Sequence, residues 1–151
     1  MRLASKSVRV PALIERALAQ PGFRGVLAFT LAEALWLHRQ GLSDDIVVAY
    51  PTVDRGALCD LVASPSSAAA ITLMVDDVAH LDVVDSLRSS LAVPVRVALD
   101  VDAGLRMGGQ HVGPKRSPLD DPADVVAEIV QRTRTVAGRA SWMTIFEVSS
   151  R

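Results

Sequence analysis

Short apolar segments alternate with amphipathic stretches along most of this chain, and the alternation indicates the type of fold. Runs rich in β-branched and aliphatic residues predict five strands, near residues 2–6, 25–29, 46–50, 71–75 and 95–101. Between these runs, apolar residues recur at spacings of three and four, which is typical of helices that pack on one side. Strands that alternate with helices in this way predict parallel βα units.

Local signals mark where the helices begin and end. The first helix is predicted to begin at Pro11, because proline suits the first turn, and to stop at Gly22. The second has Thr30 and Glu33 at the spacing of a capping box and closes at Gly41. Further helices are expected over about residues 54–62, over 76–91 and after residue 121.

The fifth predicted strand differs on its two faces. Apolar and mostly charged positions alternate strictly, with Val95, Val97, Leu99 and Val101 on one face and Arg96, Ala98, Asp100 and Asp102 on the other. A parallel strand between two layers of helices is apolar on both faces, so the charged face favours a barrel lumen. We therefore predict an α/β fold, a partial (βα) TIM-type barrel of about five βα units.

The predicted barrel domain covers residues 1–137, and residues 138–151 are expected to form a divergent C-terminal tail. This tail has room for one further strand, in the segment WMTIFEV.

Composition narrows the classes of function. A chain of 151 residues fits one domain, and its net charge of −1, with acids and bases interspersed, argues against nucleic acid as a partner. The absence of a long apolar run or a signal sequence predicts a cytoplasmic protein that does not bind membranes. Cys59, Phe29 and Trp36 are expected in the packed interior, and His38 and His80 lack a second ligand at metal spacing. We expect no metal site and a small-molecule partner.

Lys6 is the first candidate for chemistry. Strand alternation puts it on the same face as Arg2 and Ala4, near the C-terminal end of the first strand, which is where (βα) barrels carry their active sites. A lysine held there would lose solvation, and this favours the neutral amine that attacks a carbonyl carbon. The residues alone leave open an ordinary lysine in a frayed N-terminal strand.

A glycine- and base-rich segment, 108–118, follows the fifth strand and is expected to be a loop. Its backbone amides, with Lys115 and Arg116, could hold a carboxylate or a phosphate, or the loop is simply solvated. His111 is either a contact to substrate or a surface histidine. The two aspartates that share a face with Arg96 either shape a binding site or pair with that arginine.

The chain resembles the barrel domain of the fold-type III pyridoxal-phosphate enzymes in four segments, in order and spacing: RLASKSVR, FTLAEALWLHRQGLSDDIVVAYPTVD, ITLMVDD and VRVALDVDAGLRMGGQHVGPKRSPL. The likeness runs from Arg2 to Leu119. The chain is similar to the N-terminal domain of alanine racemase. It is more similar to the amino-acid deaminase/aldolase branch of the family, akin to D-threonine aldolase and D-serine dehydratase.

The resemblance implies pyridoxal phosphate as the cofactor and Lys6 as the catalytic lysine that holds it in a Schiff base. It also implies that Arg106 approaches the phenolic oxygen of the cofactor ring, although the segment 102–108 is one residue shorter before the arginine than in alanine racemase. The substrate amine would displace Lys6, the ring would stabilise a carbanion, and the freed lysine would transfer protons. Racemisation, retro-aldol cleavage and deamination all stay open.

Members of this family also carry further βα units, a phosphate-binding loop and a C-terminal β domain, for which residues after Leu119 leave no room. We therefore expect an incomplete and weakly active or inactive fragment of a lyase, aldolase or racemase that acts on D- or hydroxy-amino acids. Its expected partners are an amino-acid substrate and either a second copy or a missing portion. Two alternatives stay open: a non-catalytic pyridoxal-phosphate carrier protein, and a degenerate product without cofactor.

Overall fold

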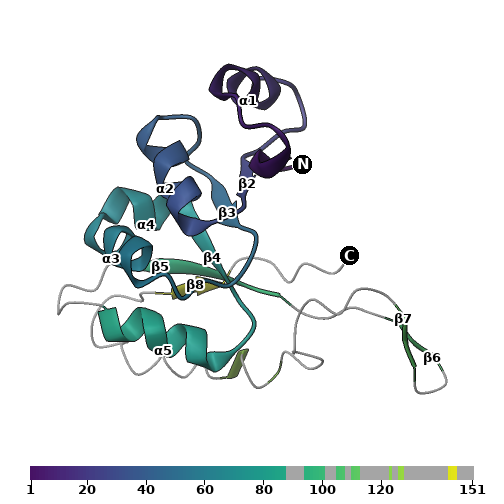
Figure 1. The fold of residues 1–151 in the computed structure, drawn as a ribbon, viewed down its shortest axis with the longest axis vertical. Helices are drawn as coiled ribbons and strands as arrows, with labels where there is room; N and C mark the ends of the chain where they lie inside the picture. The colour runs from purple at the N-terminus through teal and green to yellow at the C-terminus, as the bar shows by residue number, and fades with distance from the viewer. Residues whose placement is uncertain are drawn as a thin grey trace.

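A computed structural model describes residues 1–87, 94–100, 105–107, 110–112, 123, 126–127 and 143–145. In these residues a six-stranded sheet has the order β1-β2-β3-β4-β5-β8, and every neighbouring pair is parallel (Figure 1). The strands are β1 (Leu3–Ala4), β2 (Val26–Ala28), β3 (Ile46–Val48), β4 (Ile71–Val75), β5 (Val95–Leu99) and β8 (Met143–Ile145). Parallel strands in sequential order confirm the predicted part-barrel, and β8 lies in the segment expected to hold one further strand.

Figure 1 shows the longer helices along one face of this sheet. The described helices are the 3-10 turn η1 (Ser5–Ser7), α1 (Pro11–Leu18), α2 (Leu31–Arg39), α3 (Arg55–Ala63), α4 (Pro65–Ala70) and α5 (Val78–Leu87). No helix in the described ranges is long and apolar enough to cross a membrane. α4 was not predicted, although its start carries recognisable signals: Ser64 caps it, and Pro65 occupies its first position.

The predicted capping of α2 is confirmed with one difference. The backbone N–H of Glu33 donates to Thr30 Oγ1 at 3.2 Å, as a capping box requires. The carboxylate of Glu33 accepts from the N–H of Phe29 at 2.8 Å, one residue earlier than the usual partner. Gly41 follows the helix with φ +72°, a conformation in which glycine is favoured.

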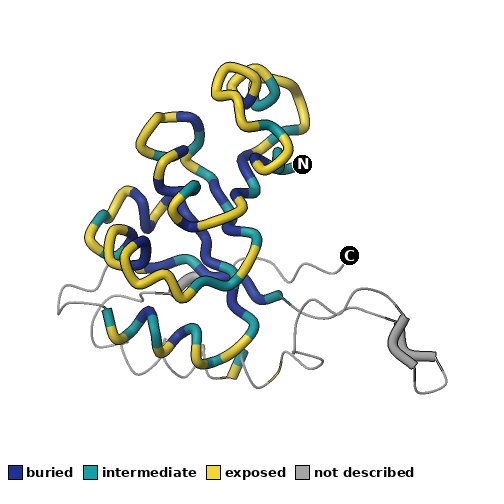
Figure 2. Tube along the Cα trace, in the orientation of Figure 1, coloured by how far each residue is buried: buried dark blue, intermediate teal, exposed yellow. Residues whose placement is uncertain are grey.

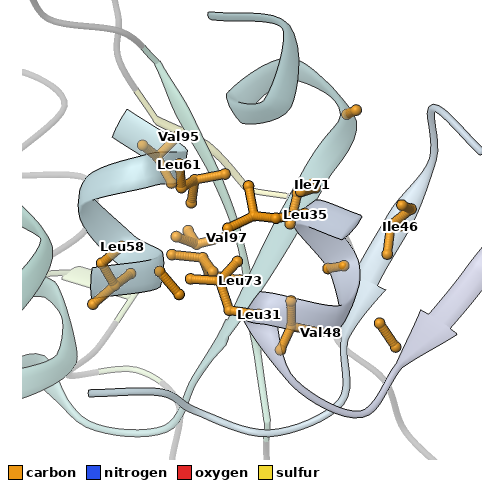
Figure 3. Packing of buried hydrophobic residues seen from close by; sticks show 14 of the residues in the cluster. Leu31, Leu35, Ile46, Val48, Leu58, Leu61, Ile71, Leu73, Val95 and Val97 are labelled. Carbon is orange, nitrogen blue, oxygen red and sulfur yellow. The ribbon is translucent and has the colours of Figure 1, made fainter. Parts of the chain in front are cut away.

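The core lies between the sheet and its helices, and the strand residues that face these helices are buried (Figure 2). Figure 3 shows leucines of α2 and α3 packed onto the covered face of β3, β4 and β5. The labelled members of this cluster are Leu31, Leu35, Ile46, Val48, Leu58, Leu61, Ile71, Leu73, Val95 and Val97. All are at most 2% exposed, so apolar burial against this one face is the main contribution to stability.

Three burial predictions were wrong. Cys59 is exposed, because α3 turns the preceding Leu58 into the core. Phe29 and Trp36 are 42% and 44% exposed instead of packed.

The face of the sheet that these helices leave uncovered has a different composition. One row of registered positions on this face runs Ala4, Leu27, Val47, Thr72 and Arg96. In β5, Val95 and Val97 are buried toward the helices while Arg96 and Asp100 are partly exposed. The predicted alternation is therefore seen at Val95, Arg96 and Val97, whereas Ala98, on the face of Arg96, is buried. Asp100 follows β5, and Val101 and Asp102 lie outside the described residues.

A charged cluster joins the N-terminal ends of three strands. Arg2 contacts the Asp45 carboxylate at 3.0 Å, and its guanidinium also donates to the Asp45 carbonyl at 3.2 Å. Arg96 approaches the same carboxylate at 3.7 Å and donates to the Ala69 carbonyl at 3.0 Å. Arg96 thus approaches Asp45, a residue that sequence reasoning did not consider as its partner.

Gly25 allows this cluster to form. Its φ is +130°, and a Cβ at this position would lie 2.2 Å from the Asp45 carbonyl oxygen and 2.7 Å from Arg2 Nη1. Real Cβ atoms essentially never approach that closely, so any side chain at this position would force the backbone of Asp45 to move.

We expect Gly25→Ala to lower the free energy of unfolding by about 3 kcal/mol, because it adds steric overlap to an unfavourable φ. Gly22→Ala is the matched control: Gly22 also has a positive φ, of +95°, but nothing lies within 4 Å of a Cβ there. That variant should lose about 1 kcal/mol. Urea denaturation measures both values, and equal losses would contradict the steric explanation.

Candidate functional site

Because neighbouring strands are parallel, their C-terminal ends meet at one edge of the sheet. The residues that follow the first five strands within two positions gather there, namely Lys6, Phe29, Tyr50, Asp76 and Asp100. In barrels of parallel strands this edge carries the binding and catalytic residues. It is therefore the candidate site.

Lys6 lies in η1 and not at the end of a strand as predicted. The Ser5 hydroxyl donates to the Leu27 carbonyl of β2 at 3.3 Å, and the Val8 N–H donates to the Ser5 carbonyl at 3.0 Å, which closes the turn. A serine that bonds to backbone in this way competes with continued strand pairing, and β1 accordingly ends at Ala4. The expected loss of solvation was also wrong, because Lys6 is exposed.

Two aromatic rings stand at the ends of the neighbouring strands β2 and β3. The rings of Phe29 and Tyr50 have centroids 5.5 Å apart and planes at 82°, an edge-to-face arrangement that favours both rings. They are 42% and 37% exposed, so the pair forms an apolar surface beside the turn of Lys6. Sequence reasoning missed this pair; its signal was an aromatic residue just after each of two consecutive strands.

Near this edge, the side chains on the uncovered face of the sheet are mostly short. Alternation from Val47 places Ala49 on this face, and Met74 is registered with Ala98 in the next two strands. Two of these three side chains are single methyl groups. The uncovered face therefore carries short side chains at Ala49 and Ala98.

Just after β4, the carboxylate of Asp76 contacts the imidazole of His80 in α5, a pair that the sequence analysis did not identify. Asp76 Oδ1 lies 3.1 Å from His80 Nδ1, a contact that has the distance but not the geometry of a hydrogen bond. Asp77 caps the start of α5 by accepting from the Ala79 N–H at 2.8 Å. The spacing of four between Asp76 and His80 across a strand-to-helix turn was the available signal. Among the described residues, no three His, Cys, Asp or Glu side chains could hold a metal ion.

The second predicted site residue, Arg106, lies in a hairpin. Its strand, β6 (Leu105–Met107), pairs antiparallel with β7 (Gln110–Val112), so Arg106 faces His111 in register. The sequence analysis predicted a loop over residues 108–118, but residues 110–112 form a strand. Figure 1 shows this hairpin, β6 and β7, away from the N-terminal end of the chain, where Lys6 follows β1. A role for Arg106 at the cofactor stays a prediction, and Lys115 and Arg116 lie outside the described residues.

Comparisons with known proteins show a family and a fold that this chain is similar to. The family described as "Alanine racemase, N-terminal domain" matches residues 10–142, a match that begins after Lys6. The crystal structure of D-threonine aldolase from Filomicrobium marinum is similar over 96% of this chain, with a TM-score of 0.58 and 20% identity. This chain covers 35% of that protein. No curated protein sequence gave a match.

We expect Ser5→Ala to lower the free energy of unfolding by about 1 kcal/mol, because it removes the bond that holds the Lys6 turn against β2. Ser7→Ala is the matched control, since Ser7 lies in the same turn but is exposed. Urea denaturation of the two variants measures the difference. Equal stabilities would show that the Ser5 hydroxyl does not hold the turn.

Proposed function

The chain belongs to the alanine racemase N-terminal domain family, whose cofactor is pyridoxal phosphate, and on that premise we propose that Lys6 binds this cofactor covalently for chemistry on an amino acid. The observation that carries the proposal is the position of Lys6, an accessible amine just after the first strand of a parallel part-barrel. A catalytic nucleophile in such a fold is expected at this edge.

The described residues fit the cofactor in two respects. The exposed amine of Lys6 is free to reach an aldehyde, and the short side chains of Ala49 and Ala98 on the uncovered face of the sheet would leave space for a flat ring. When bound, pyridoxal phosphate supplies an electron sink that stabilises negative charge at the α-carbon of an amino acid. Lys6 would then hold the cofactor and move a proton at that α-carbon.

A more specific function follows from the likeness to D-threonine aldolase. We propose a deaminase, aldolase or racemase-type activity on D- or hydroxy-amino acids, in the cytoplasm, without nucleic-acid partners. This chain spans about a third of that relative's length, so we assign the activity to the chain together with a second copy or a further portion of the barrel.

A non-catalytic carrier of pyridoxal phosphate is the second candidate. It is supported by the surroundings of Lys6: in the part of the chain that the structure describes, Lys6 is exposed and has no side-chain hydrogen bond or ion pair. Binding a cofactor needs only an accessible amine, whereas catalysis needs that amine to be held in a productive orientation. A Lys6 side chain without described hydrogen bonds therefore favours the carrier function over catalysis.

Labelling of the lysines tests cofactor binding directly, because Lys6 and Lys115 are the lysines of this chain. We expect borohydride reduction after incubation with pyridoxal phosphate to fix the cofactor on Lys6, as located by peptide mapping. Lys6→Arg should lower incorporation at least about tenfold, and Lys115→Arg, the matched control, should leave it unchanged. Label found mainly on Lys115 or on the N-terminal amine would refute the proposal.

Turnover separates the enzyme from the carrier. We expect slow and loosely specific reaction of D-threonine, D-serine and alanine, because a misplaced lysine costs about 100-fold in rate. The measurement compares the cofactor-loaded chain with its Lys6→Arg variant. Fast, saturable turnover that depends on Lys6 would exclude the carrier, and equal rates in the two proteins would exclude catalysis by Lys6.

A further inference from the structure

A cavity of about 380 Å³ opens between α1 and α2, next to the candidate site, with which it shares only Phe29 among the residues named above. Val8 and the adjoining Arg9, which follow the Lys6 turn, form one side, and Phe29 and Trp36 belong to the other. Lys6 is not among the lining residues. Cavities of this size take small molecules, and nothing in the proposed cofactor chemistry uses this one.

The floor of the cavity is apolar and its rim is aromatic. Ile14 of α1 and Leu37 of α2 are 2% and 1% exposed, so they present a dry floor. Phe29 and Trp36 are the two aromatic residues that were expected in the interior and are instead more than two-fifths exposed. Contiguous exposed apolar surface, especially when polar residues surround it, is typical of ligand-binding grooves and interaction sites.

Two opposite charges line the same cavity without neutralising each other. Arg9 is exposed, and within the described residues it takes part in no ion pair. Glu33 uses one carboxylate oxygen, Oε2, to accept from the Phe29 N–H, and no described cation lies within salt-bridge distance of its side chain. A guanidinium suits a ligand carboxylate, and a carboxylate beside an indole suits a ligand ammonium.

We propose that this cavity binds the zwitterion of a small apolar α-amino acid. The carboxylate of the ligand pairs with Arg9, its ammonium group with Glu33, and its side chain lies on Ile14 and Leu37 under Trp36. A ligand with one charge leaves the other charged residue partly desolvated and unpaired, which costs affinity. The site is separate from Lys6 and does not require bound cofactor, so it stands or falls independently of the proposed function.

The experiment uses the full chain without cofactor, titrated with L-leucine by calorimetry. 3-Methylbutylamine and 4-methylpentanoate serve as probes that keep the side chain but remove one charge each. The indole N–H signal of Trp36, assigned by its loss in Trp36→Phe, reports by NMR whether binding occurs in this cavity. Arg9→Met and Glu33→Gln test the two charges, and Arg16→Met, an exposed arginine of α1 outside the lining, is the matched control.

Glu33→Gln keeps a side-chain oxygen for the Phe29 N–H, because glutamine is also accepted at this position of a capping box. Arg9 is exposed and has no described partner, so Arg9→Met tests the proposal even if the Glu33 variant unfolds.

We expect L-leucine to bind with a dissociation constant of about 1 mM and to shift the Trp36 signal. Each single-charge probe should bind to the unaltered chain at least about tenfold more weakly than leucine does. Arg9→Met and Glu33→Gln should each weaken leucine binding at least about tenfold, while Arg16→Met leaves it unchanged. The proposal is overturned if either probe binds as tightly as leucine, if Arg9→Met has no effect, or if the Trp36 signal does not move. A Trp36 shift that follows protein concentration without ligand would assign the cavity to a second copy of the chain instead.

Discussion

Parallel pairing in strict chain order is the constraint from which the rest of the architecture follows. A chain that leaves one strand and returns to start the next beside it must cross over the sheet, and such crossovers share one hand. The intervening helices therefore accumulate on one face, where Leu35, Leu58 and Leu73 build the core. The opposite face carries a mixed row that includes Thr72 and Arg96, and the C-terminal ends of the strands gather at one edge.

The two ends of the sheet have divided roles. At the N-terminal ends, Arg2 and Asp45 tie the start of β1 to the start of β3, and Gly25 leaves space for that contact. At the C-terminal ends, Lys6 and the ring of Tyr50 are open to solvent. Stability is thus concentrated away from the edge that carries the candidate chemistry, as in other barrels of parallel strands.

Local signals in the sequence predicted much of this fold. The strand expected at 71–75 is β4 within the same bounds, and Thr30 caps α2 as its spacing to Glu33 indicated. These features depend on neighbouring residues alone. The family and its cofactor followed from longer matching segments, which carry more information than any single motif.

What could not be predicted depends on contacts between distant residues. Lys6 leaves the strand because Ser5 bonds to Leu27 across the sheet, which no local pattern announces. Arg96 approaches Asp45, which lies far from it in the sequence, because the start of β3 lies near it in space. The sequence also suggested no cavity beside the site, since an exposed Trp36 has the same helical spacing as a buried residue.

The brevity of β1 has a consequence for how the protein behaves in concentrated solution. Among the described strands β1 lies at the margin of the sheet, and an outer strand offers its backbone donors and acceptors to strands of other molecules. β1 has only two residues before the chain turns away into η1. Too few backbone groups are presented in line for a foreign strand to pair with, so this margin of the sheet is a poor template for aggregation.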